Sequence, residues 1–405
     1  MGSIESLLSF TSVMKSLGGV LLAVVILLVM VTVHEFGHYV AGKILGFKIN
    51  EFSVGFGPAI FKKRSKKSGE LFALRVIPLG GYCAFDGEDE GDDPKAKAEE
   101  PFPEQALEKS EDQAKEKVET KYPEPKGERF NDQPPWKRII VLLAGATMNY
   151  ILAVFFIIGM FAGVGRPLYT VVKEYPEETT VETTATESQT APDPYGLQTG
   201  DIILKVNGKN VYMITDYIDA LDGKKAGDVV TFTVIRNGEK TRIETPLAVD
   251  TNFKNMSDTT KLLNAMDVYG LYTVTETEGF WDTIGHSFAY SVKIGGTVLR
   301  SLGELLTGKM GLDAMGGPVT TIKITSEAAS NSMLSFLNIA AFIGVNLAVF
   351  NLLPIPALDG CKVIFCLIEW IRKKPVNRKV ETMIHFIGIL FLFGFAILVD
   401  LLQLF

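Results

Sequence analysis

The chain has 405 residues, 47% of them hydrophobic, and a formal net charge of −7 at pH 7. A chain of this charge lacks the basic surface that binds phosphate backbones, so nucleic acid is not expected as a partner. The three cysteines, Cys83, Cys361 and Cys366, fit neither a disulfide framework nor a paired zinc-binding spacing. The high apolar content makes a membrane protein the first class to consider.

Four apolar stretches are long enough, at about 20 residues, to cross a bilayer as helices. With their flanks they form segments 1–48, 137–165, 328–360 and 382–405. The first is too long, and continues too far beyond its apolar part, to be a cleaved signal peptide. The predicted fold is therefore a multi-pass α-helical membrane protein with four transmembrane helices.

The first apolar segment carries the sequence His34-Glu35-Phe36-Gly37-His38 near its end. On a helix, His34 and His38 lie one turn apart on the same face, so both can ligate one metal ion. Glu35 lies beside them, where a carboxylate can accept a proton from water at the metal. Ionisable groups at membrane depth are costly and usually functional. The motif predicts a zinc protease that works inside the membrane.

Two segments with different patterns separate the first and second spans. Residues 49–85 alternate apolar and polar side chains on either side of a basic turn, which predicts a β-hairpin. Gly55 and Gly57 would permit the backbone of another segment to approach this hairpin closely. The alternative is that the hairpin only braces the first span. Residues 86–136 are charged, mostly acidic and poor in large apolar side chains, which predicts a flexible cytoplasmic insert.

Strand-like runs separated by tight-turn signals occupy much of segment 166–275. Residues 196–208 and 229–238 are such runs, and each contains an Asn-Gly dipeptide typical of hairpin turns. The pattern resembles a PDZ domain, a small α+β fold that binds an extended peptide as an added strand. Segment 276–327 contains an amphipathic stretch suited to the outer membrane interface.

Lysine and arginine residues mark one side of this four-span topology. They cluster after the first span, at the start of the second, and in the predicted loop 361–381. Because short cytoplasmic loops carry the basic excess, that side is predicted to be the cytoplasm and the PDZ-like domain to be extracytoplasmic. Lys43 lies roughly 14 Å along a helix from His34, so its snorkelling to the headgroups would place the metal in the cytoplasmic half of the bilayer.

A catalytic zinc ion needs three protein ligands and an open fourth position. Asp359 is the candidate third ligand, because it ends the third span, which crosses the bilayer in the same direction as the first. Pro354 and Pro356 forbid a regular helix just before it. A broken helix is tolerated in a membrane where it is buried in protein or lines a cavity, and it lets Asp359 turn back toward the metal.

Several polar side chains lie within or near the spans without forming a motif. Asn149, Asn346 and Asn351 are candidates to line a cavity that admits water to the metal. For Asn149 and Asn346, hydrogen bonding between helices is an equally good explanation. His286 and His385 lie outside the metal motif and are expected to be interface residues, not ligands.

Together these motifs resemble the site-2 protease family of intramembrane zinc metalloproteases. They are HEFGH at 34–38, Leu-Asp-Gly at 358–360 after the proline-broken span, and the PDZ-like domain. Shorter matching stretches lie at 55–58, 77–82, 136–139 and 316–319. The likeness covers nearly the whole chain and is closest to the bacterial RseP/RasP-type branch, which performs regulated intramembrane proteolysis in the cell membrane.

The resemblance implies a zinc metalloendopeptidase with zinc bound by His34, His38 and Asp359 and with Glu35 as the catalytic base. It implies a membrane-dipping hairpin whose edge pairs with an unwound substrate. The residues predicted to bind substrate are Asn351, Pro354 and Pro356, together with the hairpin sequence Gly55-Phe56-Gly57. The implied substrates are single-span membrane proteins, with anti-sigma factors and remnant signal peptides as the two kinds.

Three features depart from the family pattern. Cys361 stands where a second glycine is expected, Ala146-Thr147 interrupts an Ala-Gly-Pro sequence, and the acidic insert is long. None removes a metal ligand.

Two other functions are open to the sequence. The alternative function is a non-catalytic scaffold whose PDZ-like domain binds partners. A transporter is a third hypothesis, but it would require paired internal repeats, which the sequence does not show.

Overall fold

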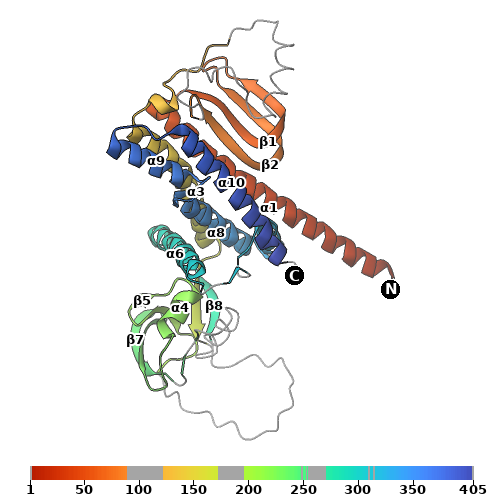
Figure 1. Ribbon diagram of the computed structural model, residues 1–405. Helices are drawn as coiled ribbons and strands as arrows, with labels where there is room; N and C mark the ends of the chain where they lie inside the picture. Colours follow the sequence, from red (N-terminus) through yellow and green to blue (C-terminus); the bar gives the residue numbers. More distant parts are fainter. Residues whose placement is uncertain are drawn as a thin grey trace. The chain divides into compact units, whose positions relative to one another are not determined.

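The computed structural model describes residues 2–88, 122–171, 196–247, 250–251, 253, 271–308, 311–312 and 315–403. The chain divides into two units, residues 1–157 with 294–405 and residues 158–293, and each is described by itself. Figure 1 shows the elements of both. Most of the predicted acidic insert 86–136 lies outside the described residues.

Four helices in the described part of the chain are long and apolar enough to cross a membrane. They are α1 (Gly2–Leu45), α3 (Pro135–Gly163), α8 (Met333–Leu352) and α10 (Arg378–Leu402). The mean hydropathy of their apolar windows lies between 2.0 and 2.7. The prediction of a multi-pass protein with four spans is confirmed.

The third span is shorter than the predicted segment 328–360, because a separate helix precedes it. Helix α7 (Pro318–Asn331) ends first, and the Ser332 hydroxyl then caps α8 by accepting a hydrogen bond from the Ser335 N–H at 3.0 Å. Segment 276–327 accordingly contains most of α7 as well as α6 (Phe280–Leu306). Helix α7 packs closely on α1, since a Cβ atom on Gly19 would lie 2.7 Å from the Ser326 carbonyl oxygen.

The predicted basic loop 361–381 between the third and fourth spans begins as a helix. Helix α9 (Asp359–Arg372) buries Cys361 and Cys366 on its inner side. Its last turn carries Arg372, where a cation stabilises a helix C-terminus, and Lys373 ends it with a left-handed φ of 54°.

The predicted hairpin consists of two long paired strands, β1 (Ile49–Arg64) and β2 (Leu71–Phe85). Both strands bend, so residues 51–54 pair with 81–84 and also with 71–74. Residues 59–64 pair with 71–75. The result is a sheet of four segments, drawn in orange in Figure 1, and segment 81–85 forms one of its edges.

Two groups of side chains attach this sheet to α1. The rings of Phe47, Phe85 and Phe130 lie with their centroids 5.4–5.6 Å apart, and Phe130 belongs to the short 3-10 helix η2 (Phe130–Asp132). At the turn between the strands, the buried Glu70 carboxylate forms an ion pair with Lys43 and accepts a hydrogen bond from Tyr39 at 3.0 Å. Lys43 therefore binds the sheet, and the depth predicted from its snorkelling loses its basis.

The second unit contains an antiparallel sheet in the order β7-β6-β4-β3-β8, with β5 paired to β4. Helix α4 (Ile214–Leu221) packs its buried Tyr217 and Leu221 into the core of this sheet. Asn207 and Asn237 adopt positive φ values of 49° and 52°, as the Asn-Gly hairpin turns predict. The strands are β3 (Arg166–Val171), β4 (Ile202–Val206), β5 (Lys209–Asn210), β6 (Val229–Arg236), β7 (Glu239–Pro246) and β8 (Leu271–Glu276). This arrangement agrees with the predicted small α+β domain.

Candidate metal centre and active site

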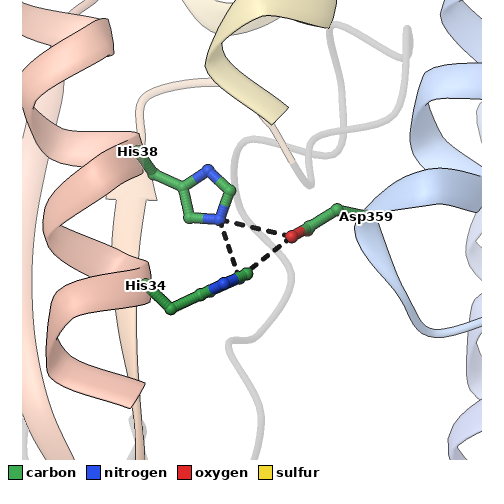
Figure 2. A group of neighbouring side chains, drawn as sticks. All are labelled: His34, His38 and Asp359. Atoms are coloured by element: carbon green, nitrogen blue, oxygen red, sulfur yellow. Dashed lines mark hydrogen bonds and ion pairs between the residues drawn. The ribbon is translucent and has the colours of Figure 1, made fainter. Parts of the chain in front are cut away.

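The three predicted metal ligands converge, although 325 residues separate the first from the last along the chain. His34 Nε2 lies 3.0 Å from Asp359 Oδ2, and His38 Nε2 lies 3.3 Å from the same oxygen. The two Nε2 atoms are 3.1 Å apart. Figure 2 shows both imidazoles projecting from α1 toward Asp359, which begins α9.

The chemistry of these groups fits a bound cation. The backbone carbonyl of Val141 accepts a hydrogen bond from His38 Nδ1 at 2.8 Å, so Nδ1 carries the proton and Nε2 keeps its lone pair. Electron-rich atoms of His34, His38 and Asp359 therefore face one another and require a positive charge between them. Two imidazole nitrogens and a carboxylate oxygen form a common ligand set for catalytic zinc.

Glycine at position 145 makes room for this arrangement. A Cβ atom there would lie 2.7 Å from His38 Cε1 and 2.8 Å from His34 Cε1, closer than packed carbon atoms approach. Helix α3 can therefore pass beside both imidazoles only where its side chain is a hydrogen atom. The interrupted sequence at Ala146-Thr147 follows this glycine and does not alter it.

Asn149 on α3 contacts the second nitrogen of His34. The side chain is buried, its amide nitrogen lies 3.3 Å from His34 Nδ1, and its Oδ1 has no hydrogen-bond partner within the described part of the chain. Turning the amide by half a revolution places Oδ1 where it can accept a hydrogen bond from His34 Nδ1–H. His34 then presents Nε2 to the metal, as His38 does, and the hydrogen bond between helices predicted for Asn149 is present.

Replacing Asn149 with leucine is expected to weaken zinc binding by about 10–100-fold, the usual effect of losing the hydrogen-bond partner of a metal-binding histidine. Leucine has a similar size but cannot accept the Nδ1 proton. Zinc affinity measured by competition with a chelator tests this expectation. Asn149→Asp, which retains an acceptor oxygen, is the control and should bind zinc more tightly than the leucine variant; equal affinities would contradict a hydrogen-bonding role.

Glu35 faces the edge of the four-segment sheet. Its carboxylate interacts with the backbone N–H of Cys83, and a Cβ atom on Gly81 would lie 3.4 Å from Glu35 Cγ. Both residues belong to the edge segment 81–85. The sequence gives no sign that Gly81 and Cys83 lie beside Glu35, because they are distant from it along the chain. Gly81 does lie in the matching stretch 77–82.

The Gly55-Phe56-Gly57 sequence forms the bend of strand β1 between its two paired segments. Gly55 and Gly57 have φ values of +86° and +80°, and a Cβ atom on Gly55 would lie 2.7 Å from the Ile77 carbonyl oxygen. The Phe56 ring covers Gly80. These contacts give the three residues a structural role in the bend, distinct from the edge that touches Glu35.

The loop between α8 and α9 carries Asp359 toward the histidines. Helix α8 ends at Leu352, after Asn351 in its last turn and just before Pro354 and Pro356. A Cβ atom on Gly360 would lie 2.6 Å from the Leu352 carbonyl oxygen, so glycine allows α9 to begin directly against the end of α8. The predicted break in the third span is confirmed, and it places Asp359 at the metal centre.

A His-His-Asp centre with an adjacent glutamate, on helices long enough to span a membrane, has the groups of a metal-dependent hydrolase. The chain belongs to peptidase family M50, whose sequence profile matches residues 22–395. It is a multi-pass zinc metalloprotease.

Several bacterial proteins are similar to this chain over most of their length. The Zinc metalloprotease RasP of Bacillus licheniformis is 27% identical over 90% of this chain and 93% of its own. The Regulator of sigma-W protease RasP of Bacillus subtilis is 29% identical, covering 90% and 92% of the two chains. The Zinc metalloprotease RasP of Geobacillus kaustophilus is 26% identical, covering 92% and 94%.

Proposed function

We propose that this zinc metalloprotease cleaves peptide bonds within the membrane-spanning segments of single-span proteins or remnant signal peptides. Zinc is held by His34, His38 and Asp359, and Glu35 is the catalytic base. The convergence of these groups at helices that span the membrane carries the proposal. The name of the Bacillus subtilis relative refers to the regulation of a sigma factor, which favours anti-sigma factors as one class of substrate.

The protein supplies the proton transfers of the reaction. A zinc ion bound at the site would act as a Lewis acid, which would polarise the scissile carbonyl and lower the pKa of bound water toward about 7. Glu35 accepts a proton from the attacking water and delivers it to the leaving amide nitrogen. Val141 and Asn149 hold the two imidazoles in the tautomer that leaves Nε2 free to bind the metal.

The substrate must unwind before it is cut, because a helix hides its carbonyl groups in internal hydrogen bonds. Segment 81–85 has a paired strand on one side only among the described residues, and its free edge faces Glu35. An unwound substrate can add to this edge as a further strand. A carbonyl oxygen of the substrate would accept the hydrogen bond from the Cys83 N–H in place of Glu35. The Glu35 carboxylate would then be free beside the scissile bond.

Other contacts to the substrate come from the broken span. Asn351, Pro354 and Pro356 precede Asp359 on the loop that reaches the metal, which supports their assignment to substrate binding. The Gly55-Phe56-Gly57 bend exposes 44% of Phe56, and this ring offers an apolar surface to an entering helix.

The orientation of the enzyme follows from its basic clusters. The clusters favour a cytoplasmic position for the β1–β2 sheet and α9. The metal ligands lie near the end of α1 and just after the end of α8 on that side, which favours the inner half of the bilayer for the metal. The PDZ-like unit is then extracytoplasmic, where it acts as a size filter or a docking site for trimmed substrates. A PDZ-like groove binds an extended chain as an added strand, which suits a substrate that has already lost its bulky domain.

Cleavage of a purified single-span protein by the full-length enzyme in proteoliposomes tests the proposed function. The expected products end within the membrane-spanning segment of the substrate, as mass spectrometry of the fragments will show. Removal of zinc by a chelator should abolish cleavage, and added zinc should restore it. Binding of the substrate without zinc-dependent cleavage would favour the non-catalytic scaffold instead.

A further inference from the structure

The loop that carries Asp359 is held by a side chain from another span. The backbone N–H groups of Leu353, Ile355 and Leu358 donate to carbonyl groups three or fewer residues away. Pro354 and Pro356 have no N–H. The one remaining N–H of the loop, that of Ala357, donates to His385 Nδ1 at 3.1 Å.

Ala357 adopts a backbone conformation that alanine disfavours. Its φ is +80°, in the region where glycine is at ease and a Cβ atom is strained. Strain of this kind persists only where the surroundings impose it. The hydrogen bond to His385 forms at this strained residue, two positions before Asp359.

Helix α10 approaches the loop closely at the same place. Gly388 lies three residues after His385, on the same face of α10, and a Cβ atom on it would lie 2.6 Å from the Pro356 carbonyl carbon. The Phe365 ring of α9 meets the His385 ring edge-on, with the centroids 5.9 Å apart. His385, which is partly buried, therefore contacts both the loop and the helix that Asp359 begins.

The far end of α10 is fixed by a second polar contact. The Asp400 carboxylate accepts hydrogen bonds from the backbone N–H groups of Val319, at 3.0 Å, and Thr320, at 3.2 Å, in the first turn of α7. Many of the large apolar side chains of α10 are exposed, so protein packing alone holds this helix weakly. Polar contacts of His385 and Asp400 therefore join α10 to the loop before α9 and to α7.

We propose that His385 is a positioning residue through which the fourth span sets the conformation of the loop that carries Asp359. Its imidazole holds Ala357 in the strained conformation and thereby aims Asp359 at His34 and His38. The proposal rests on the proposed function, in which Asp359 is a zinc ligand. It gives a specific role to a histidine that the sequence predicts to be an interface residue and not a ligand.

Zinc affinity and cleavage kinetics of the full-length enzyme test this role. His385→Leu removes the acceptor of the Ala357 N–H and should weaken zinc binding by about tenfold. This is the lower end of the effect seen when a residue that supports a metal ligand is replaced. It should also lower kcat through the weakened zinc site, and the shift of Pro354 and Pro356 on the same loop should raise KM. His385→Asn should restore zinc affinity, kcat and KM, since its Oδ1 takes the place of Nδ1 as acceptor.

Two further variants separate positioning from a general loss of stability. Adding Ala357→Gly to His385→Leu should recover part of the zinc affinity, because glycine adopts a φ of +80° without strain. Gly388→Ala should weaken zinc binding without altering His385, because the added methyl group displaces Pro356. Phe386→Leu, at an exposed neighbouring position, is the matched control and should behave as the wild type.

The outcomes distinguish the proposal from the function on which it rests. Unchanged zinc affinity in His385→Leu, or equal impairment of His385→Leu and His385→Asn, would overturn the positioning role. Asp359→Ala measured alongside tests the zinc site itself. If Asp359→Ala binds zinc as the wild type does, the proposed ligand set fails; if it loses zinc while His385→Leu does not, only the positioning role fails.

Discussion

Replacing Glu35 with glutamine is expected to remove proteolysis and to leave zinc bound. Glutamine has nearly the same shape, and its carbonyl oxygen can still accept the Cys83 N–H. It cannot take a proton from water, so kcat should fall by about 10²–10⁴-fold, the contribution of a positioned general base. Cleavage of a single-span substrate gives kcat, and elemental analysis of the purified enzyme gives the zinc content.

The control for this variant is Glu327→Gln, since Glu327 is an exposed glutamate of α7. It should cleave at the wild-type rate. Loss of zinc from Glu35→Gln would show that the carboxylate is needed to build the site, not to transfer a proton. Equal kcat values for Glu35→Gln and the wild type would eliminate the proposed mechanism.

The sequence alone predicts those parts of the site that depend on local geometry. Two histidines four residues apart on an apolar helix must share a face, so His34 and His38 could be paired without a structure. Pro354 and Pro356 must break a helix, and the number of crossings places Asp359 at the same end of the membrane as the histidines. Each step uses the period of a helix or the direction of a span.

The parts that could not be predicted are contacts between residues distant in the sequence. Asn149 with His34, Cys83 with Glu35, and His385 with Ala357 leave no periodic pattern, because each partner lies on a different element. These contacts fix tautomers and loop conformation, so they decide how well the ligands are aimed.

Two further features depend on contacts between distant residues. The predicted segment 361–381 gives no sign of helix α9, whose Cys361 and Cys366 face the core. Lys43 is predicted at the lipid headgroups, but its partner in the structure is Glu70, in the turn of the β1–β2 sheet. In both cases a long-range contact determines what the residue does.

Replacing Asp359 with alanine is expected to reduce zinc affinity by more than about 100-fold, the upper end of what losing a hydrogen-bond partner of a ligand costs. The carboxylate contributes one of three donors and the only negative charge among them. Without it, His34 and His38 offer two neutral nitrogens, which is fewer protein ligands than a catalytic zinc site requires. Chelator competition measures the affinity, and Asp132→Ala, at an exposed position, is the control.

Asp359→Ala should also lower kcat, and added zinc should restore kcat only in part. Excess zinc can refill a weakened site, but an ion held by two imidazoles has lost the charge and direction that Asp359 supplied. The Asp359→Ala enzyme saturated with zinc is therefore expected to remain well below the wild-type kcat. Full recovery at high zinc concentration would mean that Asp359 contributes affinity alone, and zinc binding equal to that of the wild type would remove it from the ligand set.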